Sequence, residues 1–300
     1  MKKKIVMGLC SIVTVVLLAG CGSDTKDEGV VFEEDVAVIL RDEVPALAQT
    51  ADEVSTQTAM QETEESTVVE EINAPEILIT PIEEVWYTED GTHVLLTATS
   101  SKAEVVNEGF DVLAQALNEW SDLVYNEILA EAEEYASWAA EHFALMEQAE
   151  AFQGYYTSMK LTPERIDDVI ASFRALHSNY TGGAHGNYGY TGYTFDVETG
   201  ELLTLDRVIA DDEGFQAAAI QRILEVLEAE PYASGVFSDY EATVRGAFAQ
   251  DGFLTWYLSQ DGIVVTFDPY EVGPYAMGAV EIPLPYEEFK DFMAIKYRPN

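Results

Sequence analysis

Two short loops carry the residue types that can bind a ligand or perform acid–base chemistry. The first is Tyr180–Gly186, in which Gly182, Gly183 and Gly186 surround His185. Glycine permits positive φ angles and a close backbone approach, so this run suits either a binding loop or a tight bend between strands. An imidazole in such a loop can act as a catalytic base, ligate a metal or simply hydrogen-bond to backbone.

The second loop is Asp268–Tyr275, which two prolines stiffen. Tyrosine gives a binding surface contact area at a low entropic cost, so a rigid loop that displays tyrosines suits recognition. The alternative is that the tyrosines fold back onto the core as a structural corner. The ligand-binding candidates in this loop are Asp268, Pro269, Tyr270, Glu271, Pro274 and Tyr275.

The sequence lacks the usual motifs of a metal site, a cofactor site and a catalytic nucleophile. The four histidines lack the His-Glu-x-x-His spacing of a zinc site. No Gly-x-Ser-x-Gly elbow is present, and the phosphate-loop pattern is absent. We therefore expect no metal, no cofactor and no catalytic residue. An enzyme acting on peptidoglycan with His185 and a carboxylate is the alternative hypothesis.

The amino terminus has the layout of an export signal. Lys2-Lys3-Lys4 precede an apolar run that is too short to span a bilayer, and the run closes on Leu18-Ala19-Gly20-Cys21. These last four residues resemble the lipobox of bacterial lipoproteins, in which the leader is cut before a cysteine that then receives lipid. We expect a signal peptide over residues 1–20 and lipidation at Cys21. The protein would then lie on the outer face of the cytoplasmic membrane, in a bacterium of the Gram-positive type.

The charge of the chain limits its partners. The net charge is −40, with 55 acidic and 15 basic residues. Such a field repels nucleic acid and favours cationic partners, although solubility or adaptation to salt explains it equally well. Residues 21–75 are acidic and show no sustained apolar period, which predicts a disordered tether.

Local patterns predict the elements that position the two loops. A β-hairpin is expected over Glu76–Thr99, followed by an N-cap at Ser100-Ser101 and helix to about residue 152, continuous or broken. One helix face is expected to carry the apolar residues that recur every three or four positions: Val106, Phe110, Leu113, Leu117, Trp120, Val124 and Ile128.

The remaining elements mix strands and helices without a regular alternation. Strands are expected at Tyr155–Leu161, Val169–Tyr180, Asn187–Val197, Glu201–Leu205, Phe253–Leu258, Ile263–Phe267 and Ala279–Leu284. Helices are expected at Glu213–Glu228 with a cap at Asp211 or Asp212, at Ser238–Phe248 and at Tyr286–Ala294. This mixture predicts an α+β fold in which an antiparallel sheet packs against helices.

Three runs of the chain resemble a known extracellular domain. Tyr180–Gly186, Phe195–Leu205 and Phe267–Gly278 are similar, in order and spacing, to the domain shared by the RsiV anti-sigma factors and the PdaC-type peptidoglycan deacetylases. The resemblance covers residues 180–290. It implies a PdaC-like amino-terminal subdomain at 76–179 and an RsiV-like domain at 180–300.

The resemblance implies a noncatalytic domain that faces the cell envelope. In RsiV-like proteins this domain binds lysozyme, a strongly basic protein. We expect neither a segment that holds a sigma factor nor a deacetylase domain in this chain. The resulting hypothesis is a surface lipoprotein that recognises a basic protein such as lysozyme, or peptidoglycan or another envelope component. A structural envelope spacer is the third possibility.

Overall fold

A computed structural model describes residues 1–7, 74–249 and 254–299 of the protein. Cys21, nearly all of the expected tether and most of the expected leader lie outside these ranges. The described residues belong to one compact unit. Among them, no helix combines the length and the apolar character that crossing a membrane requires.

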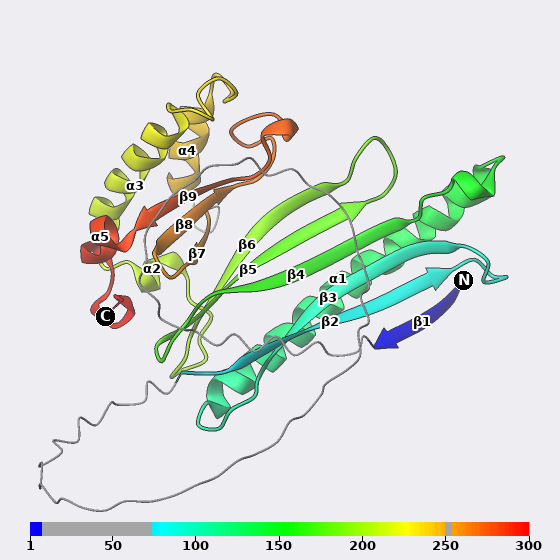
Figure 1. The fold of residues 1–300 in the computed structure, drawn as a ribbon, viewed down its shortest axis with the longest axis horizontal. Helices are drawn as coiled ribbons and strands as arrows, with labels where there is room; N and C mark the ends of the chain where they lie inside the picture. The colour runs from blue at the N-terminus through cyan, green and yellow to red at the C-terminus, as the bar shows by residue number, and fades with distance from the viewer. Residues whose placement is uncertain (8–73, 250–253, 300) are drawn as a thin grey trace, which may run out of the picture. The chain divides into compact units, whose positions relative to one another are not determined.

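A six-stranded sheet forms one layer of this unit (Figure 1). Its strands, in spatial order, are β1 (Lys2–Met7), β2 (Ile77–Tyr87), β3 (Val94–Val105), β4 (Tyr155–Ile166), β5 (Ile170–Tyr180) and β6 (Asn187–Asp196). Neighbours are antiparallel except β3 and β4, which are parallel. The predicted β2–β3 hairpin and the α+β class are confirmed.

Helix α1 (Asp111–Leu145) makes the long crossover that the parallel pair requires and covers one face of the sheet (Figure 1). It is one continuous helix of 35 residues. Trp120 packs edge-on against Tyr193 and Phe195, with ring centroids 4.7 and 5.9 Å away. The predicted apolar face is buried through Leu113, Leu117, Trp120, Val124 and Ile128, and it continues through Ala132, Ala136 and Ala139.

The predicted start of this helix is wrong. Ser100 and Ser101 do not cap it, because β3 continues through both to Val105. The Ser101 hydroxyl donates to the Met159 carbonyl at 3.2 Å and accepts the Leu161 amide at 3.1 Å. Pairing with the neighbouring strand has therefore replaced the local capping tendency of serine.

The first two residues assigned to the helical face are also placed differently. Val106 follows β3 and is exposed, and Phe110 is the residue before the first helical turn. Both precede Asp111, so the buried stripe begins at Leu113.

A second, three-stranded antiparallel sheet contains β7 (Thr255–Leu258), β8 (Gly262–Phe267) and β9 (Val280–Pro285). Helices α3 (Asp212–Leu227) and α4 (Tyr240–Ala249) pack against it around a core that includes Phe215, Ile223, Val265, Phe267 and Ile282. The predicted cap of α3 is confirmed, since the Asp211 carboxylate accepts the Gly214 amide at 3.0 Å. Strand β6 belongs to the first sheet although it follows the expected domain boundary at residue 180, and that boundary stays a prediction.

Two predicted elements are shorter than expected. Residues 201–205 form one isolated bridge, between Phe195 and Leu202, before the short helix α2 (Leu205–Val208). The last helix, α5 (Tyr286–Phe289), passes at once into a 3-10 turn. The expected helix does not continue to residue 294, because residues 292 and 293 bond to another part of the chain. The Phe292 carbonyl accepts the two backbone amides that precede α3, and Met293 forms a β-bridge with Ile209.

The two sheets approach closely where β6 passes β7. A Cβ atom on Gly192 would lie 1.7 Å from the Trp256 carbonyl oxygen. The Leu258 amide of β7 donates to the Ser172 hydroxyl of β5 at 3.0 Å. Glycine at position 192 therefore sets the distance between the sheets.

Replacing Gly192 with alanine is expected to destabilise the protein. The added methyl group meets backbone atoms that cannot rotate away, so the free energy of unfolding should fall by about 2 kcal/mol or more. Chemical denaturation followed by tryptophan fluorescence measures this change.

Gly246→Ala is the matched control. Gly246 lies inside α4, and a Cβ atom there meets nothing within 4 Å. Alanine in a helix interior should raise the free energy of unfolding by about 0.5–1 kcal/mol. Equal effects of the two substitutions would contradict the close approach of the sheets.

Candidate binding site

The β5–β6 connection is the first of the two predicted loops. Gly182 and Gly183 have φ angles of 96° and 101°, which residues with a Cβ atom rarely adopt. The Tyr180 hydroxyl donates to the Gly183 carbonyl at 3.1 Å and closes the turn. A Cβ atom on Gly186 would lie 2.6 Å from the Asn179 carbonyl oxygen. The backbone of this loop therefore requires all three glycines.

The loop after β8 is the second. Asp268 Oδ1 accepts the Tyr190 amide at 2.8 Å and ties the start of this loop to β6. Gly189 makes room for that contact, since a Cβ atom there would meet Asp268 Oδ2 at 2.2 Å. The Asp268 amide donates to Glu271 Oε2 at 2.6 Å. Both half-buried carboxylates thus hold backbone groups in place.

Tyr270 lies at the tip of this second loop in a strained conformation. Its φ angle is 75°, the only positive value among the non-glycine residues that the structure describes. A left-handed conformation costs such a residue about 1–2 kcal/mol. The side chain is 56% exposed, so Tyr270 does not fold back onto the core. Pro269 before it is half-buried, and Pro274 is exposed.

Tyr275 joins the two loops. Its hydroxyl donates to the Gly186 carbonyl at 2.9 Å, across 89 positions of sequence. Its ring stacks on His185 with centroids 4.0 Å apart and an interplanar angle of 21°. Tyr188 and Tyr270 flank it at 5.9 and 5.7 Å. We name His185, Tyr188, Tyr270 and Tyr275 the tyrosine cluster.

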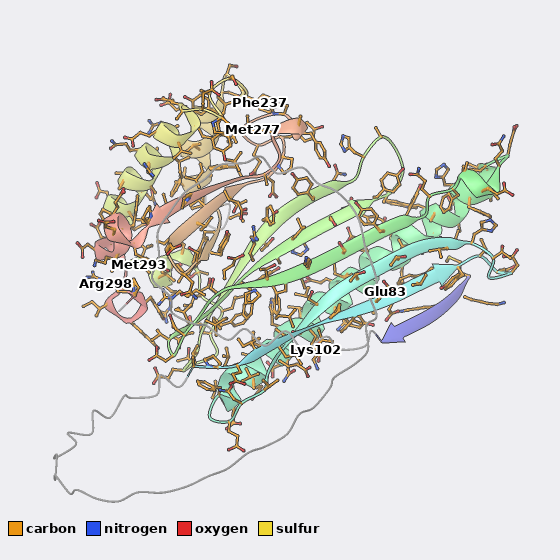
Figure 2. The ribbon with its side chains drawn as sticks, in the orientation of Figure 1. Glu83, Lys102, Phe237, Met277, Met293 and Arg298 are labelled. Atoms are coloured by element: carbon orange, nitrogen blue, oxygen red, sulfur yellow. The ribbon has the colours of Figure 1, made fainter. Side chains whose placement is uncertain are left out.

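Residues next to the second sheet and its helices support the Asp268–Tyr275 loop. The Phe237 amide donates to the Val272 carbonyl at 2.9 Å. The Met277 side chain packs so closely on Gly235 and Gly273 that a Cβ atom at either would lie 2.6 or 2.5 Å from it. Phe237 and Met277 lie close together at this end of the sheet (Figure 2). The loop that carries Tyr270 and Tyr275 is therefore supported by packed side chains.

A cavity of about 200 Å³ lies beside the β5–β6 connection. Gly182 and Gly183 form part of its wall, together with His142, Met146, Phe152, Tyr155 and Tyr180. His142 Nδ1 lies 3.0 Å from the Tyr155 hydroxyl. Burial raises the pKa of Tyr155, so the hydroxyl keeps its proton at neutral pH and can donate it to the imidazole.

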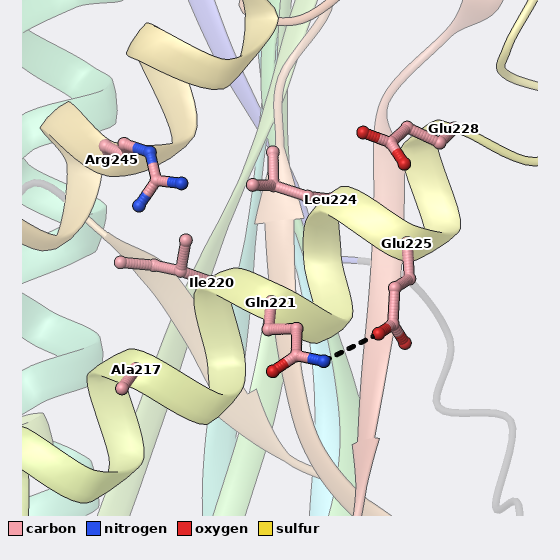
Figure 3. Close-up of a pocket in the computed structure, with 7 residues that line it drawn as sticks. All are labelled: Ala217, Ile220, Gln221, Leu224, Glu225, Glu228 and Arg245. Atoms are coloured by element: carbon pink, nitrogen blue, oxygen red, sulfur yellow. Dashed lines mark hydrogen bonds between the residues drawn. The ribbon is translucent and has the colours of Figure 1, made fainter.

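A second cavity, of about 270 Å³, lies between α3 and α4 (Figure 3). Ile220 and Leu224 contribute its apolar wall, and Gln221 donates to Glu225 at 2.9 Å along its rim. Arg245 on the other side is paired with Glu241 at 2.9 Å. None of the predicted site residues within the described ranges lines this cavity.

The structure thus brings the predicted loops together, and it adds two residues that the sequence analysis did not single out. The first is Tyr188, which lies two positions before Tyr190 on β6. This spacing puts both side chains on one face of the strand, and it was the signal available in the sequence. The second, His142, lies near the end of α1, and no local pattern marked it.

The tyrosine cluster offers contact surface without an evident acid–base pair. His185 Nδ1 lies 2.8 Å from the Gly186 carbonyl oxygen, so Nδ1 carries the proton and donates it. Within the described ranges, His185 hydrogen-bonds to no carboxylate. The same ranges contain no group of three or more histidine, cysteine or acidic residues that could hold a metal ion.

The two carboxylates below the cluster make the loop sensitive to pH. Burial raises the pKa of Asp268 and of Glu271, and the charge of Asp268 raises the pKa of Glu271 further. A carboxyl group with a raised pKa binds its proton more tightly in the folded protein than in the unfolded chain. Its ionised form therefore disfavours folding above that pKa, and the penalty disappears as the pH falls through it.

Asp268→Asn is expected to remove this penalty while an oxygen still accepts the Tyr190 amide. The variant should be at least as stable as the wild type at pH 7. As the pH falls toward the ordinary carboxyl range, protonation of Asp268 removes the penalty from the wild type. The free energy of unfolding of the wild type should therefore rise relative to that of the variant. Denaturation at a series of pH values measures the difference.

Asp122→Asn, on the exposed face of α1, is the control. It reports what replacing an exposed carboxylate with an amide does to stability over the same pH range. A pH profile for Asp268→Asn that is the same as that of Asp122→Asn would show that burial does not govern the Asp268 carboxylate.

Known proteins share this fold. A solved structure of a DUF3298 family member from Bacteroides fragilis matches with a TM-score of 0.56 and 22% identity, covering 74% of this chain and 94% of that one. A DUF3298 family protein from Pseudomonas aeruginosa PAO1 matches with a TM-score of 0.52 and 14% identity, covering 76% of this chain and 99% of that one. No curated protein matches the chain.

A family model described as "Protein of unknown function (DUF3298)" matches residues 217–287. This range runs from within α3 to the start of α5 and contains the Asp268–Tyr275 loop, whereas the Tyr180–Gly186 loop lies outside it. Residues 217–287 are therefore a DUF3298 domain, within a fold that is shared with two solved DUF3298 family structures.

Proposed function

We propose that this chain is a noncatalytic surface receptor that binds a cationic protein, such as a lysozyme, through the tyrosine cluster. One observation carries the proposal: two loops that the sequence marks as candidates meet in a single surface, where His185 stacks on Tyr275 and Tyr270 is exposed. Aromatic side chains on a rigid support are the usual anchors of a protein interface.

Electrostatics supports a basic partner. A net charge of −40 attracts a cationic protein over long range and speeds its association at low salt. The tyrosines then supply short-range contact that salt screens much less. The resemblance to the RsiV-like domain, which binds lysozyme, is the further reason for choosing that ligand. Peptidoglycan or another envelope component is the alternative ligand.

The proposal includes the absence of catalysis at this surface. The Nδ1 proton of His185 is donated to backbone, and the ring stacks on Tyr275. Turnover of muropeptides that is lost in a His185→Ala variant would contradict this part and would favour the peptidoglycan enzyme.

The proposal also places the protein on the outer face of the cytoplasmic membrane, held by lipid on Cys21. Cys21→Ser should move the protein from the membrane fraction to the soluble fraction of the cells. Cys10→Ser, in the expected leader, is the control and should leave the protein in the membrane fraction. Equal retention of both variants would exclude an anchor at Cys21.

Tyr270→Asn is the test of the binding surface. Asparagine tolerates the left-handed conformation, so the variant should remain as stable as the wild type or become slightly more stable. Loss of the exposed ring should weaken binding to immobilised lysozyme about tenfold. Surface plasmon resonance at several salt concentrations measures the affinity, and thermal denaturation measures the stability.

Ile295→Asn is the matched control, because Ile295 is 83% exposed and lies near Lys296, which pairs with Asp196 at the other end of β6. That end lies about 30 Å from the tyrosine cluster at ~3.3 Å per strand residue. An unchanged affinity in Tyr270→Asn, or equal losses in both variants, would count against this surface. No retention of the wild type at low salt would exclude lysozyme as the ligand.

A further inference from the structure

The edge of the six-stranded sheet contains a site at which a buried carboxylate and an aromatic ring contact a lysine side chain. Glu84 of β2 is 2% exposed, and its carboxylate contacts the Tyr125 hydroxyl of α1 and the Lys3 ammonium of β1. The Lys3 ammonium also lies 5.0 Å from the centre of the Trp86 ring. A carboxylate and an indole on the same strand face thus hold one cation between them.

The strand that supplies this lysine is added along the backbone of β2. β1 pairs antiparallel with residues 82–87, and Lys3 lies opposite Trp86. The described part of β1 ends at Met7, which lies opposite Ile82. The edge of β2 therefore provides a fixed register and a side-chain requirement at one position.

Lys3 belongs to the expected leader, so a chain that begins at Cys21 would lack this strand. The edge of β2 would then be unpaired and the Glu84 carboxylate would lose its counter-charge. An open sheet edge readily accepts an extended segment of another polypeptide. We propose that the edge of β2 is a second binding site, which takes an extended, lysine-bearing segment of a basic protein.

This inference rests on the proposed function for the removal of the leader and for the basic character of the partner. It adds the mode of binding, which is strand addition, and the residue that the partner must supply, which is a lysine opposite Trp86. Before the leader is removed, residues 2–7 of the chain itself then occupy this site.

The test uses the full chain with Lys3→Glu, which places a negative charge against Glu84 and so weakens the pairing of β1. The probe is a fluorescently labelled peptide with the sequence of residues 2–7, Lys-Lys-Lys-Ile-Val-Met. Fluorescence anisotropy should show that it binds the Lys3→Glu chain at least about tenfold more tightly than the wild-type chain, in which the native segment competes at high effective concentration.

Glu84→Gln in the Lys3→Glu chain should then weaken binding of the peptide about tenfold, because the buried carboxylate no longer faces the ammonium group. Glu83→Gln in the same chain is the matched control, since Glu83 is the neighbouring residue on the opposite strand face and should change the affinity by less than about twofold. Figure 2 labels Glu83 on this strand.

Two peptide variants test the same contact without altering the chain. Norleucine in place of the second lysine, which corresponds to Lys3, should weaken binding about tenfold, whereas norleucine in place of the first should not. This pair decides the question if circular dichroism shows that Glu84→Gln does not fold. No binding of the peptide to the Lys3→Glu chain, or equal losses for both peptide positions, would overturn the proposal.

Binding of lysozyme to the Lys3→Glu chain separates this inference from the proposed function. If lysozyme depends on Tyr270 while the peptide fails to bind, the tyrosine cluster stands and the edge site is wrong. If the peptide binds through Glu84 while lysozyme does not bind, the edge site stands and the ligand proposed for the tyrosine cluster is wrong.

Discussion

A half-buried charge network around Arg174 joins the two sheets. The Arg174 guanidinium on β5 contacts Glu164 of β4 at 2.9 Å and Glu281 of β9 at 2.8 Å. The Tyr257 hydroxyl of β7 also donates to Glu281 at 2.8 Å, and Arg174 lies 5.1 Å from the centre of the Tyr190 ring. Removing Arg174 would leave two half-buried carboxylates without their counter-charge, so the ion pairs of the network depend on this one residue.

This connection fixes the strands from which the candidate loops extend. β6 begins immediately after His185 and Gly186, and β8 ends immediately before Asp268. Gly192 and Gly189 allow the second sheet to lie against β6, the first at the Trp256 backbone and the second at the Asp268 carboxylate. Paired strands therefore position the tyrosine cluster. Its geometry depends on the contacts between β6 and the second sheet, several residues away along the strand.

The sequence predicted the features that local patterns decide. The buried stripe of α1, the Asp211 cap and the β2–β3 hairpin follow from periodicity, capping chemistry and turn residues. Features that depend on distant partners were missed. Ser101 looks like a cap, and only its pairing with β4 shows that it belongs to a strand. The parallel pairing of β3 with β4 has no local signal either.

The candidate site shows the same division. The glycines around His185 and the stiff loop at Tyr270 were recognisable as unusual, because positive φ angles and prolines leave a mark on the sequence. Their contact through Tyr275 was not recognisable, because it depends on the register of β6 against the second sheet. His142 contributes to the neighbouring cavity only because α1 is long enough to reach the same end of the sheet.

The length of α1 has a mechanical consequence. At ~1.5 Å per residue, a helix of 35 residues is about 50 Å long. Ala74 lies at one end of this helix, where its carbonyl accepts a hydrogen bond from Asn107 just before the helix begins, whereas His142 lies in the last turn beside the Gly182–Gly183 wall. The helix therefore acts as a rigid spacer between the end of the sheet at Ala74 and the end that carries the Gly182–Gly183 wall.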